Sequence, residues 1–398
     1  MNDNAAHAVA ASCVFDGVGI QSDSAVIIEG AHIVDVRPHS ELPADMPVVH
    51  LPGETWLAPG FIDVQVNGGG DVLFNDEPTA AGIDAIAAAH RRFGTTGLLP
   101  TLISDTSEKM QLALDAARTA AARNPGILGI HFEGPFLSPQ KPGVHDAGMF
   151  RAPDARDLEL LTAWNDGVVL VTLAPERVPA EFIADLTRAG VRVALGHSMA
   201  TYAETQAALE GGMTGFTHLF NAMPQLSSRE PGPIAAALEC DRAWFGMIVD
   251  GEHVSPAMLR LALRGRARPM LVTDAMPPIG GRERSFRLYG AEITVRDGRC
   301  TRADGTLAGA AIDMASSVRN AVRELQVPLT TALNYASTEP AEFLGLGTVL
   351  GRLAPAFRAD MVAFAPETID VIETWVAGVA RKSQVAPLSV ALSQSAST

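Results

Sequence analysis

Cysteine is scarce in this sequence. The 398 residues include three cysteines, Cys13, Cys240 and Cys300, and no CxxC pair. An odd number of widely spaced cysteines argues against a disulfide framework and against a zinc site built from thiolates. Free thiols are therefore expected.

Signals for membranes and secretion are missing as well. No apolar run approaches the roughly 18 residues of a membrane span, and no basic segment precedes an apolar stretch at the N-terminus. A signal peptide would need such a segment. These absences predict a soluble, cytoplasmic protein with no membrane partner.

Positive charge is also in short supply, since 30 Lys and Arg stand against 45 Asp and Glu, a net charge of −15. An acidic surface repels nucleic acid, so no nucleic-acid partner is expected. A small anionic substrate is compatible with this charge, because a few cations in a cleft can outweigh a screened global charge.

Neither GxGxxG nor GxxxxGK[ST] follows an early strand, which argues against an open nucleotide-binding sheet. The chain instead contains eight apolar runs separated by Ala-rich helical patterns. Such runs are typical of parallel strands buried on both faces, and eight of them predict a closed (β/α)₈ barrel. The runs are GFIDVQV, TGLLPTLIS, ILGIHFEG, VVLVTLAP, RVALGHS, GFTHLF, WFGMIVDG and PMLVTDA.

Both ends of the chain have a different sequence pattern, with short strand-like runs broken by turns. A barrel takes roughly 250 residues, which leaves enough chain for a second unit. We predict that residues 1–57 and 345–398 pair into a small β-sandwich domain and that residues 58–344 form the barrel. A β-hairpin is expected near 285–305, helices near 308–325 and 329–337, and a loose tail over 383–398.

Ionisable and amide side chains fall where the predicted strands end. The carboxyl ends of barrel strands meet on one face and carry the active site in such folds. A catalytic zinc-type centre needs three protein ligands and an open position, and Glu133, His197 and His218 supply nitrogen and oxygen donors for one. The residues at these ends are Gln65, Asn67, Glu133, His197, His218, Asp250, His253 and Asp274.

Two of these assignments have structural alternatives. Asp274 is a candidate general base, but a helix cap or loop turn would also explain an aspartate just before Pro277 and Pro278. His131 alternates with Glu133 on the third strand, and we interpret it as a residue that supports the metal ligands or as a packing residue.

A different chemistry is suggested by Gly196-His197-Ser198-Met199-Ala200, which resembles the nucleophile elbow of serine esterases. Ser198 would then need a downstream histidine, and only His218 and His253 follow. Because this interpretation leaves Glu133 and His197 without a role, the metal centre is favoured.

Several longer motifs carry a family resemblance: APGFIDVQVNGGG, GIHFEGPF, KPGVHDAGMF, GFTHLFNAMPQLSSREPG, MIVDGEHVS, LVTDAMPPIG and LAGAAIDM. From about Ala58 to Asp360 the chain resembles the N-acetylglucosamine-6-phosphate deacetylases of the amidohydrolase superfamily. The resemblance implies one divalent ion per subunit on Glu133, His197 and His218, with zinc first and iron or another ion as alternatives.

The same resemblance implies the other roles. Asp274 matches the general acid/base, and His145 matches the residue that contacts the acetyl carbonyl. Arg229 matches an arginine that reaches the phosphate in the partner subunit's site, which implies a homodimer. The implied substrate contacts are Val144, His145, Asn221, Ala222, Arg229, Asp250, His253, Leu307, Ala308 and Gly309.

One departure from the wider superfamily stands on the first strand. Many members have HxH there for a second metal, whereas this chain has Gln65-Val66-Asn67. Neutral amides are poor ligands, so Gln65 and Asn67 are interpreted as a vestigial second site near the one metal. A pseudoenzyme would also lack these histidines, but the presence of Glu133, His197, His218 and Asp274 argues against it.

The predicted reaction is removal of the N-acetyl group of N-acetylglucosamine 6-phosphate, with Asp274 as base and then acid. The alternatives are the galactosamine epimer, another amide such as an N-acyl amino acid or cyclic amide, and a non-catalytic scaffold.

Overall fold

The computed structural model describes residues 5–296 and 298–381. The predicted tail at 383–398 and the last part of the predicted terminal domain lie outside the described residues. Within the described ranges, no helix is both long and apolar enough to cross a membrane.

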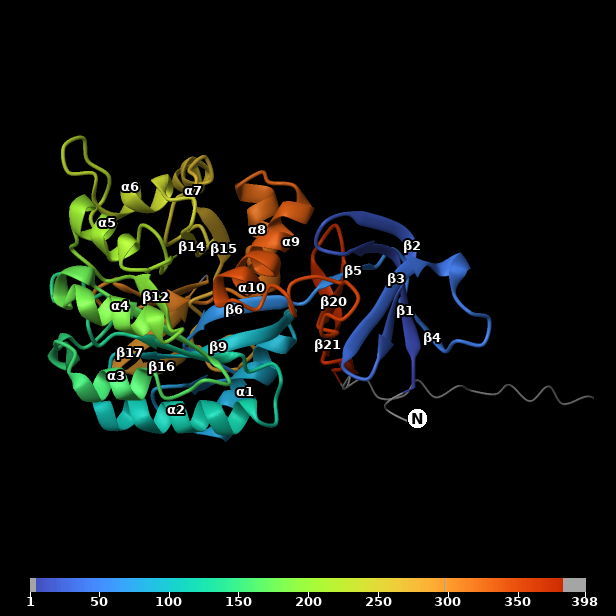
Figure 1. Ribbon diagram of the computed structural model, residues 1–398, viewed down its shortest axis with the longest axis horizontal. Coiled ribbons are helices and arrows are strands. Elements are labelled where there is room, and N and C mark those ends of the chain that lie inside the picture. The colour runs from blue at the N-terminus through green and yellow to red at the C-terminus, as the bar shows by residue number, and fades with distance from the viewer. Residues whose placement is uncertain (1–4, 297, 382–398) are drawn as a thin grey trace, which may run out of the picture.

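Eight parallel strands form the barrel, in the order of the eight predicted runs. The first and last strands approach through a bridge between Val66 and Ala275, so the sheet nearly closes and the predicted barrel is confirmed (Figure 1). The strands are β6 (Phe61–Val66), β9 (Thr95–Ile103), β10 (Gly129–Glu133), β11 (Val168–Leu173), β12 (Arg192–Leu195), β13 (Gly215–Phe216), β14 (Trp244–Met247) and β15 (Arg268–Leu271).

The sixth strand is shorter than its apolar run suggested. The run GFTHLF was expected to be a strand throughout, but β13 ends at Phe216. His218, Phe220 and Ala222 have φ angles of 31°, 80° and 49°. This left-handed backbone cannot continue a strand, so β13 ends before His218.

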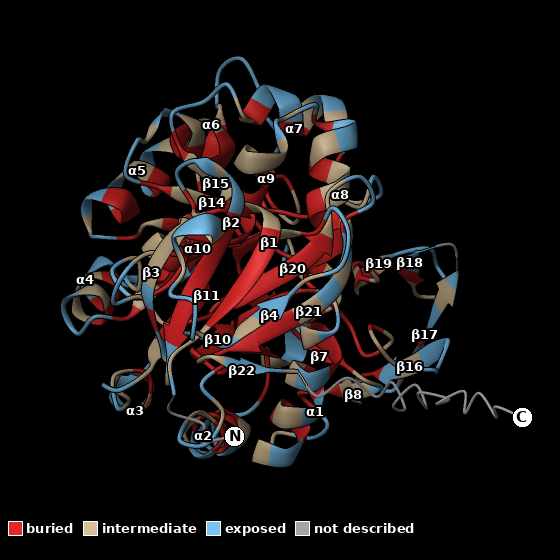
Figure 2. Cartoon of the chain, turned by 90° about the vertical axis from the view of Figure 1, so that its right-hand side faces the viewer, coloured by how far each residue is buried: buried red, intermediate tan, exposed pale blue. Residues whose placement is uncertain are grey.

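Helices surround the barrel, and their inner faces are buried while their outer faces are exposed (Figure 2). Small residues allow close packing: in α2, Ala113, Ala117 and Ala120 are fully buried. Thr79 and Thr106 cap α1 and α2 through their hydroxyl oxygens. The helices are α1 (Ala80–Arg91), α2 (Ser107–Ala121), α3 (Ala155–Leu161), α4 (Ala180–Arg188), α5 (Tyr202–Glu210), α6 (Gly232–Glu239), α7 (Pro256–Ala262), α8 (Met314–Glu324), α9 (Leu329–Ala336) and α10 (Thr338–Leu344).

The two ends of the described chain pair in a second, eight-stranded sheet, as predicted for the terminal segments (Figure 1). Its antiparallel β5–β20 pairing joins the N-terminal strands to the C-terminal ones. The exact domain boundaries stay predictions. The strands are β1 (His7–Phe15), β2 (Ile20–Glu29), β3 (His32–Pro38), β4 (Val48–His50), β5 (Trp56–Pro59), β20 (Met361–Ala365), β21 (Asp370–Val376) and β22 (Val379–Ala380).

A small sheet is inserted between β15 and α8, where a hairpin was predicted. It contains β16 (Ser285–Leu288), β17 (Ala291–Arg296), β18 (Arg299–Thr301) and β19 (Leu307–Ala310). The helix expected from residue 308 begins at Met314 instead, where Asp313 caps it. Gly309 explains part of this difference, since its φ is 62° and an added Cβ would lie 2.6 Å from Met276 Cγ.

Candidate metal centre

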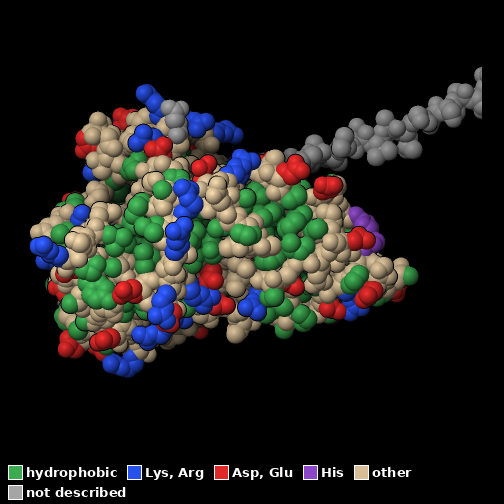
Figure 3. Space-filling model, turned by 90° about the horizontal axis from the view of Figure 1, so that it is seen from above, with side chains coloured by type: hydrophobic (Ala, Val, Ile, Leu, Met, Phe, Trp, Pro, Cys, Tyr) green, Lys and Arg blue, Asp and Glu red, His purple; other side chains and the backbone are tan. Residues whose placement is uncertain are grey.

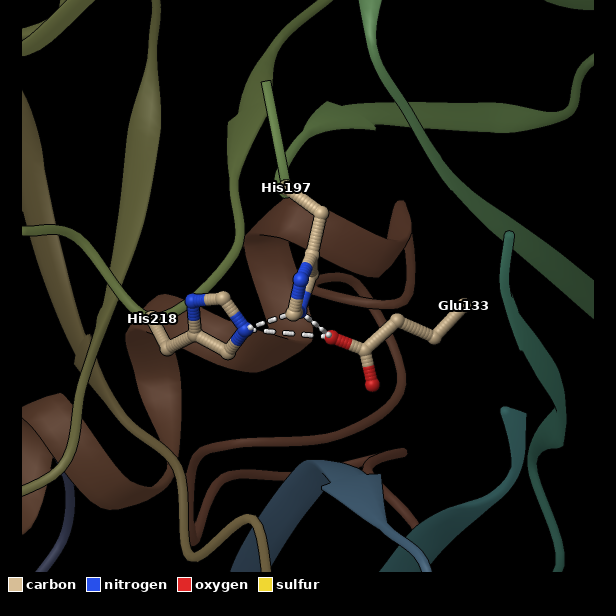
Figure 4. A group of neighbouring side chains, drawn as sticks. All are labelled: Glu133, His197 and His218. Atoms are coloured by element: carbon tan, nitrogen blue, oxygen red, sulfur yellow. Dashed lines mark hydrogen bonds and ion pairs between the residues drawn. The ribbon is translucent and has the colours of Figure 1, made fainter. Parts of the chain in front are cut away.

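Glu133, His197 and His218 meet at the carboxyl end of the barrel, and all three are buried (Figure 4). Glu133 Oε1 lies 3.1 Å from His218 Nε2 and 3.3 Å from His197 Nε2. The two Nε2 atoms are 3.1 Å apart. Three different strands therefore bring their ligand-type atoms into one compact group.

Local backbone conformation directs the two histidines toward this group. His197 and His218 each stand two residues beyond the end of a strand, β12 and β13, with φ angles of 47° and 31°. Left-handed backbone is uncommon outside glycine and costs free energy. Such a cost is typical of residues that a functional centre holds in place.

The hydrogen bonds around His197 leave its Nε2 free to bind a cation. His197 Nδ1 lies 2.9 Å from the carbonyl oxygen of Lys141. A carbonyl can only accept, so Nδ1 carries a proton, and in the neutral ring Nε2 then presents a lone pair. The Nε2 of His218 faces it at 3.1 Å, and a divalent cation between these nitrogens and Glu133 would relieve the contact. The donor set fits a divalent borderline metal.

Asp274 lies beside this group and is held by two amides. Asn67 Nδ2 donates to Asp274 Oδ1 at 2.6 Å, and Gln65 Nε2 donates to the same oxygen at 3.2 Å. Gln65 Nε2 also lies 3.3 Å from both oxygens of Glu133. Gln65 thus donates to both carboxylates, and Asn67 donates to that of Asp274.

The electrostatic environment of Asp274 differs from that of an exposed aspartate. Burial, followed by the nearby charge of Glu133, raises the pKa of Asp274 to about 6. A carboxyl group with such a pKa can exchange protons near neutral pH, which suits a general acid/base.

A cavity of about 390 Å³ opens above the centre. Of the predicted substrate contacts, Asp250, Ala308 and Arg229 do not line it. Asp250 lies behind His253, with its Oδ2 2.6 Å from His253 Nδ1. Arg229 is exposed in the loop before α6. The predicted residues that do line the cavity are Asn67, Glu133, Val144, His145, His197, His218, Asn221, Ala222, His253, Asp274, Leu307 and Gly309.

The serine-esterase alternative finds no support in this geometry. Ser198 Oγ donates to Glu176 Oε2 at 2.7 Å, and the backbone N–H of Ala200 donates to that hydroxyl. No imidazole is among the hydrogen-bond partners of Ser198 in the described chain.

His145 enters the cavity from the loop after β10, and its ring centroid lies 4.4 Å from that of His197. Burial, and then the proximity of His197, lower the pKa of His145 to about 3, so the ring is neutral at neutral pH. The sequence motifs did not single out its partner Ser104, whose Oγ lies 2.9 Å from His145 Nδ1. Ser104 follows β9 directly, so the rule that found the other residues could have found it.

His131 lies below the centre and is buried, as predicted for a packing residue. Its Nε2 lies 2.7 Å from Thr172 Oγ1, and its Nδ1 lies 3.2 Å from Thr101 Oγ1. Both ring nitrogens are therefore occupied within the barrel interior.

Known proteins are similar to this chain in fold and in sequence. A family model described as the amidohydrolase family matches residues 56–390. The N-acetylgalactosamine-6-phosphate deacetylase of Shewanella sp. (strain ANA-3) is 43% identical over 85% of this chain and 86% of its own. The N-acetylglucosamine-6-phosphate deacetylase of Haemophilus influenzae is 34% identical over 92% and 96%. A crystal structure of N-acetylglucosamine-6-phosphate deacetylase from Pasteurella multocida superposes with a TM-score of 0.91 at 35% identity, covering 95% and 100%.

A glutamate and two histidines at the carboxyl end of the barrel, together with these similarities, define a metal-dependent hydrolase. With the family match over most of its length, the chain belongs to the amidohydrolase family.

Proposed function

We propose that this protein hydrolyses the N-acetyl group of N-acetylglucosamine 6-phosphate, giving glucosamine 6-phosphate and acetate. The observation that carries the proposal is the meeting of Glu133, His197, His218 and Asp274 in one buried cavity. Relatives and a solved structure that cover most of the chain are named for this reaction.

Each residue has a place in the reaction. Glu133, His197 and His218 would hold a divalent ion, a Lewis acid that activates water and polarises the amide carbonyl. Asp274 takes the proton of the attacking water as its base and then returns it to the leaving amine nitrogen. Asn67 holds one oxygen of Asp274. His145 donates a hydrogen bond to the oxygen on which negative charge develops.

The phosphate needs cationic partners, and this subunit offers few. Among the described residues that line the cavity there is no lysine or arginine. His253 and Ala222 line the cavity, and the His253 ring and the Ala222 backbone N–H are candidates for phosphate donors. We therefore assign the missing charge to Arg229 of a second subunit in a homodimer, because an arginine fork suits phosphate.

The face that carries the loop before α6 is suited to such an interface. Hydrophobic side chains lie between scattered charged ones on this side of the molecule (Figure 3). Leu226, three residues before Arg229 in the sequence, is 42% exposed. Apolar side chains of this kind gain free energy when a second subunit covers them.

A second candidate substrate is the 4-epimer, N-acetylgalactosamine 6-phosphate. The 43% identical relative from Shewanella is named for that activity. Both sugars present the same acetamide and phosphate, so the centre described above serves either. Zinc is the first candidate for the ion and iron the second. A cytoplasmic location stays a prediction, in keeping with three cysteines that are free.

The test is acetate release by the purified full-length protein from both sugar phosphates, side by side. We expect faster release from the glucosamine compound, loss on chelation, and recovery with one equivalent of zinc or iron per chain. Faster release from the galactosamine compound would assign the epimer instead. Absence of release from both with metal bound would overturn the deacetylase proposal, and an N-acyl amino acid assayed in parallel would then test the other amide class.

A further inference from the structure

The ring of His145 has a defined hydrogen-bond partner on its inner side. His145 Nδ1 lies 2.9 Å from Ser104 Oγ and 3.3 Å from the backbone N of Ser104. A backbone N–H can only donate, so Nδ1 must be the accepting nitrogen. In a neutral ring the proton then sits on Nε2, the other nitrogen of a residue that lines the cavity.

Ser104 is itself fixed on several sides. It is buried at the end of β9. Gly134 makes room for its hydroxyl, because a Cβ at that position would lie 2.2 Å from Ser104 Oγ. The same hydroxyl lies 3.3 Å from the carbonyl oxygen of Glu133, so the shorter contact is the one to His145.

The inserted sheet is hydrogen-bonded to this region at two points. Tyr289, in the turn between β16 and β17, donates its hydroxyl proton to the carbonyl oxygen of Ser104 at 2.5 Å. Arg302, just after β18, donates from Nη2 to the carbonyl oxygen of Val144 at 2.8 Å. The insertion is therefore hydrogen-bonded to Ser104, which contacts the His145 ring, and to Val144, which precedes His145 in the chain.

We propose that Ser104 and Tyr289 are positioning residues that hold His145 in the tautomer with its proton on Nε2. This inference rests on the proposed amide hydrolysis. In this tautomer His145 can donate to the oxygen of the amide as negative charge develops there. In the other tautomer Nε2 would present a lone pair to that oxygen, and the interaction would be repulsive.

The kinetic test compares Ser104→Ala, Ser104→Thr and Tyr289→Phe in the metal-loaded enzyme. Ser104→Ala keeps the backbone donor, so kcat should fall on the order of 10-fold, the worth of one hydrogen bond, with KM and metal content unchanged. Ser104→Thr keeps a hydroxyl and should recover most of kcat. Tyr289→Phe should lower kcat several-fold. Ser317→Ala is the matched control, since this buried hydroxyl donates to the Asp313 carbonyl within α8, and its kcat should not change.

An altered acyl group separates positioning from general damage. A trifluoroacetyl substrate has a more reactive carbonyl and depends less on stabilisation of the oxyanion. The deficit of Ser104→Ala should therefore shrink on that substrate. An equal deficit on both acyl groups, or a loss that follows metal content, would overturn the proposal.

A spectroscopic readout keeps this inference distinct from the proposed function. In protein labelled with ¹⁵N-histidine, and assigned with His145→Gln, the Nδ1 resonance of His145 should lie in the range of an unprotonated ring nitrogen. Ser104→Ala should move it toward the tautomeric average. A protonated Nδ1 in the wild type would overturn the proposal even if acetate is released. The predicted spectrum in a protein that releases no acetate would uphold the positioning and leave only the reaction to be reassigned.

Discussion

The carboxyl end of the barrel and the terminal sheet differ in how far their charged and histidine side chains are buried. Glu133, His197 and Asp274 are buried at the barrel end, whereas His32 and His50 of the terminal sheet are exposed. The interior of that sheet is apolar, with Val9, Val26, Leu57 and Met361 among its fully buried residues.

Left-handed backbone occurs in both regions, since Asp23, Ile369 and Ala377, in or beside strands of the terminal sheet, also have positive φ angles. His197, His218 and Asp274 adopt left-handed φ angles of 47°, 31° and 51° while buried among other polar groups. Buried polar groups and strained backbone both cost stability. At the barrel end both costs fall on the reactive groups themselves, whereas the terminal sheet buries mainly apolar side chains.

The largest effect is expected from Asp274→Asn, which should remove activity without loss of stability. The amide cannot accept the proton of water, so kcat should fall by about 10²–10⁴-fold. The metal content should stay at one ion per chain, because Asp274 is not among the three clustered ligands. Kinetics, metal analysis and denaturant unfolding measure the three quantities. Near-normal turnover would remove Asp274 as the base.

Arg229→Ala should affect substrate recognition in the neighbouring subunit. Loss of a charged hydrogen bond should raise KM for the phosphorylated sugar about 10–100-fold and leave the unphosphorylated sugar unchanged. Arg266→Ala is the control, since Arg266 is exposed and paired with Asp241.

Mixed dimers test whether Arg229 acts in the site of the partner subunit. A dimer of one Arg229→Ala subunit and one Asp274→Asn subunit should regain one active site, because the intact Asp274 then receives the partner's arginine. Equal losses for both sugars, or no recovery on mixing, would contradict an arginine shared across the interface.

Met361→Ala should lower stability and leave activity unchanged, the reverse of the effect expected for the barrel variants. Met361 is fully buried between β5 and β21, and its truncation should lower the free energy of unfolding by about 2–5 kcal/mol. At a temperature where the variant is folded, kcat should equal that of the wild type. Val18→Ala, at a side chain 76% exposed, should leave both quantities unchanged. A selective fall in kcat would show that the two regions are not separable.

The last prediction concerns Asp63, whose substitution should affect only how the free energy of unfolding depends on pH. Burial raises the pKa of Asp63 to about 7, from about 3.9 in an unfolded chain. Its stabilising contribution is therefore complete below pH 4 and is lost as the pH rises through 7. Asp63→Asn should flatten this decline by up to about 4 kcal/mol, as measured by denaturant unfolding from pH 4 to 8. Parallel profiles for both proteins would contradict the assignment.

The sequence predicted the barrel and three clustered residues because both depend on local patterns. Each apolar run marks a strand, and a polar residue after it must lie at the shared edge, which is how Glu133, His197 and His218 were found. His145 came from the family resemblance alone, since its loop carries no periodic signal.

The contacts that the sequence could not supply are those made across long separations. Tyr289 and Ser104 are 185 residues apart in the chain, and nothing in either segment predicts their hydrogen bond. The short β13 was missed for a related reason. Its continuation is as apolar as a strand, but tertiary packing holds His218 and Phe220 in left-handed backbone.

The pairing of β5 with β20 also orders events during synthesis. Trp56–Pro59 must wait for Met361–Ala365, about 300 residues later, before their backbone groups can pair. At 5–20 residues per second, this wait is roughly 15–60 s. During that time one edge of β5 is open, so the nascent chain carries an exposed β-strand that only its own C-terminal portion is shaped to cover.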